Sequence, residues 1–252
     1  DERRAHAGLR WQGAVSGGPA EEGRRERLIK LASAMAFLAV VAVAVLVVIT
    51  QSQTEGGDAS LEGVADVRRL LRGVPQEGMV LGEPRAKLTL VEFADLQCPT
   101  CKAYAEEALP ALIRGPVARG EAKLDFRNFT IVGPESATAG AAALAAGEQG
   151  RGWSFVELFY RNQGGEETGY VTDSFLTAIA RAAGVADIAR WNRIRRGDRV
   201  LDAVAATTAE AEGLGFTGTP SFALESPSTR GLQALGAVPS QETLESALAG
   251  TS

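Results

Sequence analysis

The sequence predicts an α/β protein in which a long helical block separates two groups of strands. Three observations support this class. Two apolar, strand-like segments, residues 87–94 and 123–131, flank a helical segment that is long enough for a right-handed crossover between parallel strands. Residues 134–214, the helical block, then carry apolar residues at helical spacing. Two short strand-like segments and a last helical one follow, so the order is β-α-β, helices, β-β-α.

The first half is defined by apolar runs and by the residues that end them. A short helix is expected within residues 61–73, because its apolar residues recur at helical spacing and a glycine closes it. The strand KLTLVEFA covers residues 87–94, and a helix is expected from Cys98 to about Arg114. The second strand, KLDFRNFTI, covers residues 123–131 and should pair in parallel with the first.

The second half begins with the alanine-rich start of the helical block. One of its helices should be capped by Thr172 or Asp173 and closed by Gly184. The last elements are expected at residues 221–224 (strand), 232–235 (strand) and 241–249 (helix). With the first half they make one domain over residues 74–250.

Composition excludes one class of partner. The chain has 252 residues and a formal net charge of −5, and its isoelectric point is about 5.2. An acidic chain without a basic stripe or a nucleic-acid-binding motif gives no electrostatic footprint for DNA or RNA. We therefore expect no nucleic-acid partner.

Residues 31–49 read LASAMAFLAVVAVAVLVVI and contain no charge. As a helix this run is about 29 Å long, close to the hydrocarbon thickness of a bilayer. A cleaved signal peptide would have a shorter apolar region that ends in an A-x-A-like site, and this run has neither feature. We predict a transmembrane helix over residues 28–50.

The flanks of this helix predict its orientation. Several basic residues precede it, whereas residues 51–67 contain no lysine or arginine. The positive-inside rule then places residues 1–27, expected to be a disordered tail, in the cytoplasm. Residues 51–73 form a linker and the short helix, and the domain beyond them lies outside the cytoplasmic membrane, where disulfides can form.

Cys98 and Cys101 are the only cysteines of the chain and are separated by two residues. Structural zinc needs four ligands, and the sole histidine, His6, is in the tail, so no metal site is expected. The same lack of histidine excludes a Cys–His nucleophile pair. A disulfide across four residues would restrain the unfolded chain by only about 2 kcal/mol, which makes a purely structural role a poor fit.

A redox role fits the local physics. Residues three apart on a helix are neighbours, so the two sulfurs can reach bonding distance with modest adjustment. Pro99 suits the first helical position, and Cys98 would then lie at the helix N-terminus, which favours a thiolate and lowers the thiol pKa from about 8.5 to about 3.5–7.5. Cys98 is predicted to be the exposed attacking thiol and Cys101 the resolving thiol.

Five segments together resemble one family. They are GVPQEGMVLGEP, LTLVEFADLQCPTC, KLDFRNF, ESATAGAAALAAGEQGRGW and GFTGTPSF, in this order within residues 74–250. The chain resembles the DsbA-like thiol–disulfide oxidoreductases of the thioredoxin fold, specifically the membrane-anchored bacterial branch. The resemblance implies a thioredoxin fold with the helical block as an inserted domain between its two halves.

The resemblance adds further site residues. Glu92 would be the buried acid beneath the disulfide; it shares a strand face with Leu88 and Leu90, and burial would raise its pKa and make it a proton shuttle for Cys101. The alternative is an ordinary strand-end carboxylate facing solvent. Thr219–Pro220 matches the family's cis-proline, with the Thr219 backbone turned toward a substrate strand.

The dipeptide between the cysteines departs from the family's most oxidising members, which carry Pro-His where this chain has Pro99 and Thr100. Both residues are expected at the substrate-binding surface. Without the histidine, the Cys98 thiolate would depend on the helix terminus and on hydroxyl donors such as Thr100. About 150 mV separates the thioredoxin and DsbA potentials, and the sequence does not fix a position between them.

Two groups in the helical block are expected to be structural. Trp153 and Trp191 should be packing residues, and the cluster Arg193, Arg195 and Arg196 should form a solvated face.

The resemblance implies an enzyme without a cofactor that oxidises cysteine pairs of reduced exported proteins. A quinone-linked membrane protein of the DsbB or vitamin-K-epoxide-reductase type would reoxidise it. Two alternatives stay open: a reductase or isomerase that uses the same pair with reversed electron flow, and a non-enzymatic envelope binding module that uses the groove of the fold.

Overall fold

The structure is a computed structural model of the whole chain, and it describes residues 41, 61–227, 229–235 and 238–249. The predicted tail and, apart from Val41, the predicted transmembrane helix lie outside these residues, as do residues 51–60 of the linker. Among the described residues, no helix has both the length and the apolar character needed to cross a membrane. The description below concerns the unit that starts at Asp58.

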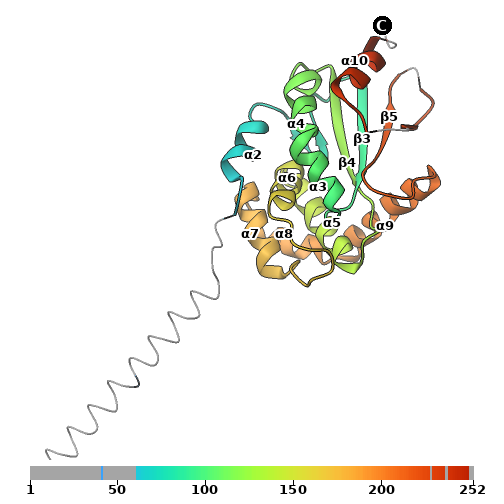
Figure 1. Cartoon of the computed structure of the whole chain (residues 1–252). Helices are drawn as coiled ribbons and strands as arrows, with labels where there is room; N and C mark the ends of the chain where they lie inside the picture. The colour runs from blue at the N-terminus through green and yellow to red at the C-terminus, as the bar shows by residue number, and fades with distance from the viewer. Residues whose placement is uncertain (1–40, 42–60, 228, 236–237, 250–252) are drawn as a thin grey trace, which may run out of the picture. The chain divides into compact units, whose positions relative to one another are not determined.

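A single six-stranded sheet organises this unit (Figure 1). Its order is β1-β2-β4-β3-β5-β6. Only β3 and β4 are parallel, and the other neighbours are antiparallel. The predicted α/β class and the parallel pair are therefore confirmed. The strands are β1 (Gln76–Glu77), β2 (Val80–Leu81), β3 (Leu88–Ala94), β4 (Ala122–Asn128), β5 (Ser221–Glu225) and β6 (Gln233–Leu235).

Helices cover the sheet and fill the segment between β4 and β5. Figure 1 shows α3 and α4 following one another along the strands. Helices α4 and α10 lie near one end of the sheet, and α7 and α8 lie near the other end. The described helices are α2 (Val64–Leu70), α3 (Pro99–Glu107), α4 (Leu109–Leu112), the π-helical turn η1 (Ile113–Val117), α5 (Pro134–Gly147), α6 (Gly152–Arg161), α7 (Asp173–Ala183), α8 (Ile188–Arg195), α9 (Asp198–Gly213) and α10 (Gln241–Ala249).

Strand β3 is buried on both faces, and its alternating side chains enter two separate cores. Leu88 and Leu90 join the main core with α3, α4 and α6. Val91 and Phe93 join a smaller core on the opposite face, together with Ala211 at the end of α9. Strand β3 lies in the middle of the sheet and packs into both cores. The two cores therefore fix the position of the loop and helix α3 that follow it.

Two predicted boundaries were wrong. The helix expected from Cys98 to Arg114 is interrupted after Glu107, because Pro110 has no N–H with which to continue the ladder. The strand expected to reach Ile131 ends at Asn128. Beyond it, Ile131 N donates to Asp95 Oδ2 (2.9 Å) instead of to a neighbouring strand.

The hairpin of β1 and β2 was not predicted. Its two-residue strands pair Gln76 with Leu81 and Glu77 with Val80 around Gly78, whose φ is +58°. Two residues are too few to show the alternation by which strands are recognised in a sequence. The hairpin extends the sheet through the pairing of β2 with β4.

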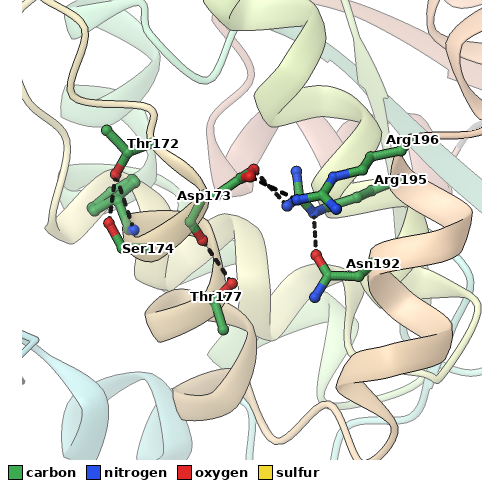
Figure 2. A network of polar contacts seen from close by, with 8 residues as sticks. Thr172, Asp173, Ser174, Thr177, Asn192, Arg195 and Arg196 are labelled. Carbon is green, nitrogen blue, oxygen red and sulfur yellow. Dashed lines mark hydrogen bonds and ion pairs between the residues drawn. The ribbon is translucent and has the colours of Figure 1, made fainter. Parts of the chain in front are cut away.

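The solvated face predicted for the arginine cluster is wrong for Arg195, which is 5% exposed. Figure 2 shows why: Arg195 and Arg196 both reach Asp173, each at 2.6 Å, and Arg195 also donates to Asn192. The Arg195 guanidinium also lies over the Trp191 ring, 4.8 Å from its centroid. This network ties α8 to the first turn of α7, next to the predicted cap Thr172, which accepts from Phe175 N.

The packing role predicted for the two tryptophans is confirmed. Trp153 and Trp191 are fully buried. Their indole N–H groups donate to Met79 O (2.7 Å) and Ala142 O (2.9 Å). Trp153 thus links the helical block to the β1–β2 hairpin.

Candidate active site

The two cysteines lie at the start of α3, just after the loop that follows β3. Cys98 is the N-cap residue, Pro99 occupies the first turn, and Cys101 is one turn inside the helix. Both thiols are free. The prediction of an exposed attacking thiol is wrong in degree: Cys98 is 8% exposed and Cys101 is fully buried. Cys98 is covered because residues Thr219 and Pro220, called the Thr219 segment below, lie against its sulfur.

A hydroxyl and a carbonyl oxygen surround the Cys98 sulfur. Thr100 Oγ1 lies 2.8 Å from Cys98 Sγ and donates to Thr219 O at 2.9 Å. The Cys98 thiol reaches the same carbonyl at 3.5 Å. The peptide bond between Thr219 and Pro220 is cis, as the resemblance implied. Residues far apart in the sequence therefore meet at one sulfur.

These surroundings lower the pKa of Cys98 from 9.0 to about 5. The largest cause is a hydrogen bond from the Cys101 side chain, and desolvation opposes it. The Thr100 and Thr219 side chains and the Cys101 backbone N–H lower the pKa further. A thiol with this pKa is ionised at neutral pH, as expected for a cysteine at a helix N-terminus.

Cys101 has the opposite character. Burial raises the pKa of its thiol well above 9.0, and the neighbouring Cys98 sulfur adds to the rise. At neutral pH Cys101 keeps its proton and donates it toward the Cys98 thiolate. The pair is thus one nucleophile and one proton-bearing partner.

Glu92 lies in the middle of β3, paired with Phe126 of β4 and Phe222 of β5. It is 3% exposed, so the predicted burial is confirmed and a solvent-facing carboxylate is excluded. Burial, and then the charge of Glu157, raises the pKa of Glu92 to about 8. Its Oε1 atom has no hydrogen-bond partner among the described residues.

Glu157 was missed by the sequence reasoning. It lies on α6 with 1% of its surface exposed, and burial raises its pKa to about 7 against the opposing effect of Arg161. Arg161 Nη2 lies 3.5 Å from Glu157 Oε2. One signal was present, since Glu157 is the only acid in the apolar run WSFVELFY.

The loop that leads into the cysteines is held by side chains that the sequence reasoning also missed. Gln97, fully buried, donates to Glu167 Oε1 (2.8 Å) and accepts from Glu167 N (3.0 Å). Gln163 donates to Leu96 O at 2.7 Å. Asp95 accepts from the Gln97 backbone N–H at 2.9 Å. The contacts of Gln97 with Glu167 and of Gln163 with Leu96 join residues distant in sequence and leave no local pattern.

This arrangement can exchange thiols and disulfides. It offers an ionised sulfur near the surface, a buried partner thiol and a buried acid on the strand beneath them. In the described part of the chain no group of three or more His, Cys, Asp or Glu side chains could hold a metal ion.

The chain is similar to several known proteins. The family model described as "Thioredoxin" matches residues 75–238. "Probable disulfide bond formation protein D" of Bacillus cereus is 27% identical over 144 residues, which are 56% of this chain and 67% of that protein. "Disulfide bond formation protein D" of Bacillus subtilis is 28% identical over 133 residues, 52% of this chain and 56% of that protein. The solved structure of oxidised BdbD from Bacillus subtilis has a TM-score of 0.60 at 19% identity and covers 71% of this chain and 96% of that one.

Proposed function

Because this chain belongs to the thioredoxin family and is a DsbA-like thiol–disulfide oxidoreductase, we propose that it introduces disulfides into exported proteins through Cys98 and Cys101. The observation that carries the proposal is the split between the two thiols: the pKa of Cys98 is about 5, whereas that of Cys101 is well above 9.0. A stable Cys98 thiolate favours the dithiol form of the enzyme, and an enzyme that prefers to be the dithiol oxidises its substrates.

The reaction starts from the Cys98–Cys101 disulfide. A substrate thiolate attacks Cys98 Sγ, the bond between the two cysteine sulfurs breaks, and Cys101 leaves with the electron pair and takes a proton from Glu92. A second substrate thiolate then attacks the substrate sulfur of the mixed disulfide, and Cys98 leaves as the thiolate. The substrate has lost two electrons and gained a disulfide, and the enzyme holds both electrons as a dithiol.

The Thr219 segment is proposed to bind the substrate chain. Its carbonyl lies within 3.5 Å of Cys98 Sγ, so an extended substrate bonded to this backbone would have its cysteine at the reactive sulfur. Pro99 and Thr100, which follow Cys98 in the chain, are exposed. Together these residues form the proposed substrate-binding surface.

The membrane tether is proposed on sequence grounds. The apolar run of residues 31–49 would anchor the chain in the cytoplasmic membrane with the catalytic domain outside. There it would meet newly exported, reduced proteins and a quinone-linked reoxidase of the DsbB or vitamin-K-epoxide-reductase type. Such a partner would accept the two electrons from the dithiol and restore the disulfide.

A direct experiment mixes the oxidised full chain with a reduced, unfolded protein that contains one cysteine pair. The expected result is one substrate disulfide per enzyme disulfide consumed, and none with the Cys98→Ala variant. Wild-type enzyme that leaves the substrate reduced would contradict the proposal. Reaction with a membrane-impermeant thiol reagent in intact cells tests the location, and labelling of Cys98 only after lysis would contradict the extracytoplasmic assignment.

A further inference from the structure

One glutamine side chain is bonded to the backbone of Cys98 itself. Gln163 follows the end of α6, and its amide group donates to Leu96 O at 2.7 Å and to Cys98 O at 3.2 Å. An amide NH2 group has two donors, so each carbonyl oxygen takes one of them. Across the part of the chain that the structure describes, no other side chain bonds to the backbone of Cys98.

We propose that Gln163 is a positioning residue of the redox pair, which holds Cys98 in the backbone conformation that turns its sulfur toward the N-terminus of α3. The inference rests on the proposed function in taking Cys98 as the attacking thiol. Gln163 does not touch the sulfur, and it would act on the sulfur only through the backbone of Cys98.

Cys98 has the extended backbone of a helix N-cap, with φ −73° and ψ 122°. In this conformation a side chain reaches back toward the N–H groups of the second and third helical residues. The third helical residue is Cys101, and its backbone N–H lowers the pKa of Cys98. A rotation of the Cys98 backbone away from these angles would turn the sulfur away from that N–H group.

The contacts of the Cys98 peptide groups fix these angles. The angle ψ sets the direction of the Cys98 carbonyl, which accepts from Lys102 N at 3.2 Å as well as from Gln163. On the other side, Cys98 N donates to Asp95 O at 3.1 Å. The bond from Lys102 is the first of the helix, where helices fray. The second donor, Gln163, therefore holds the carbonyl, and with it the sulfur, in place.

The amide group also offsets charge beside the sulfur. The carbonyl oxygens of Leu96 and Cys98 converge on one NH2 group, and both carry partial negative charge. Without the amide, these oxygens would stand unneutralised close to an ionised sulfur. Loss of a donor near an anion raises its pKa. Loss of the N-cap geometry would raise the pKa of Cys98 in the same direction.

The loop between α6 and α7 has other anchors, so a change at Gln163 leaves it in place. Asn162, the preceding residue, accepts from Glu62 N at 2.8 Å. Glu167 exchanges two hydrogen bonds with Gln97, at 2.8 and 3.0 Å. The effect of replacing Gln163 is therefore confined to the two carbonyl groups that it bonds.

The test replaces Gln163 by methionine in the full chain, because methionine keeps the length of the side chain but has no N–H. Thiolate absorbance of the reduced chain, followed against pH, should show the pKa of Cys98 raised by about one unit. This is about a tenfold loss of thiolate stabilisation. For a two-electron couple it moves the reduction potential of Cys98–Cys101 by about 30 mV to more negative values.

Gln149→Met is the matched control. Gln149 is half-buried like Gln163, follows α5, and makes two hydrogen bonds of 2.9 Å with the backbone of Asp187. Both variants should lower the urea midpoint of the oxidised chain to a similar extent. Only Gln163→Met should also change the pKa of Cys98 and the potential, which a general loss of stability would not do.

A third variant, Gln163→Lys, keeps N–H donors at this position. Its ammonium group has three of them and can bond to both carbonyl oxygens. The pKa of Cys98 should therefore stay at the wild-type value or fall below it. A pKa raised as in Gln163→Met would contradict the role assigned to the donors.

The outcomes separate this proposal from the proposed function. An unchanged pKa of Cys98 in Gln163→Met, or an equal change in Gln149→Met, would overturn the role of Gln163. Wild-type enzyme that leaves a reduced substrate unoxidised would contradict oxidase function. The titrations need no substrate, so they would then still decide whether Gln163 positions Cys98.

Discussion

The Thr100 hydroxyl donates a 2.9 Å hydrogen bond to the carbonyl oxygen of Thr219, 119 residues further along the chain. The same hydroxyl oxygen lies 2.8 Å from Cys98 Sγ. A hydroxyl has one proton, so it can bond either to the carbonyl or to an ionised sulfur, but not to both. When Cys98 is a thiolate and the hydroxyl turns to it, the Thr219 carbonyl becomes free to accept a hydrogen bond from a substrate.

Thr100→Val tests this hydroxyl. Valine keeps the shape of threonine but cannot donate to the thiolate, so the pKa of Cys98 should rise by about one unit. The thiolate absorbance of the reduced protein, followed against pH, measures this shift. Thr138→Val, an exposed threonine on α5, is the matched control and should leave the titration unchanged. An unaltered Cys98 titration in Thr100→Val would show that the hydroxyl does not stabilise the thiolate.

Thr219→Val should change the pKa of Cys98 without lowering the stability of the fold. The Thr219 hydroxyl is buried and has no hydrogen-bond partner in the described parts of the chain. Removing an unbonded buried hydroxyl should leave the free energy of unfolding of the oxidised protein unchanged or raise it by about 1 kcal/mol. The Thr219 side chain lowers the pKa of both thiols, because its hydroxyl can donate to a sulfur once that sulfur is ionised, so the pKa of Cys98 should rise in the variant. Urea unfolding and thiol titration measure the two effects, and a large loss of stability would contradict this interpretation.

Glu92→Gln should change how stability depends on pH. In the folded protein the pKa of Glu92 is about 8, against 4.5 in an exposed carboxyl group. The folded state therefore binds more protons than the unfolded state between these values, and the contribution of Glu92 to stability falls as the pH rises through this window. The variant should match wild type near pH 4.5 and be more stable at pH 8, by on the order of a few kcal/mol. A stability difference that is constant across this range would contradict the buried, neutral state of Glu92.

Cys98 should give the opposite dependence in the reduced protein. Its pKa is about 5 in the folded state against 9.0 for an ordinary thiol. Here the unfolded state binds more protons, so the reduced form should gain stability as the pH rises from about 5 toward about 9. The oxidised form has no thiol to titrate and provides the control. Denaturant unfolding of both wild-type forms at several pH values measures the difference in stability, which should grow with pH. The Cys98→Ala variant should lack the gain in stability that reduced wild type shows in this pH range.

Most of the fold could be predicted from local patterns. Strand β3 is predictable because it is rich in apolar residues and ends at Ala94, shortly before the helix-starting Cys-Pro pair. The π-helical turn at Ile113–Val117 could not be predicted, because the non-helical conformation of Gly115 leaves no trace in the spacing of apolar residues. The β1–β2 hairpin depends on its pairing with β4.

The site divides in the same way. The redox pair Cys98 and Cys101 could be predicted from its spacing at a helix start, whereas Glu92 was suggested by the family resemblance. The contribution of Glu157 depends on α6 packing beside α3, and the Gln97–Glu167 contact spans 70 residues. Interactions of this kind are set by tertiary packing and have no signature in sequence spacing.

The reduction potential of the Cys98–Cys101 couple, titrated against glutathione in the full chain, tests the central claim most directly. A thiolate stabilised to a pKa of about 5 favours the dithiol, so the potential should lie nearer the value of about −120 mV that is typical of DsbA than the value of about −270 mV of thioredoxin. A potential below about −250 mV would contradict the assignment as an oxidase.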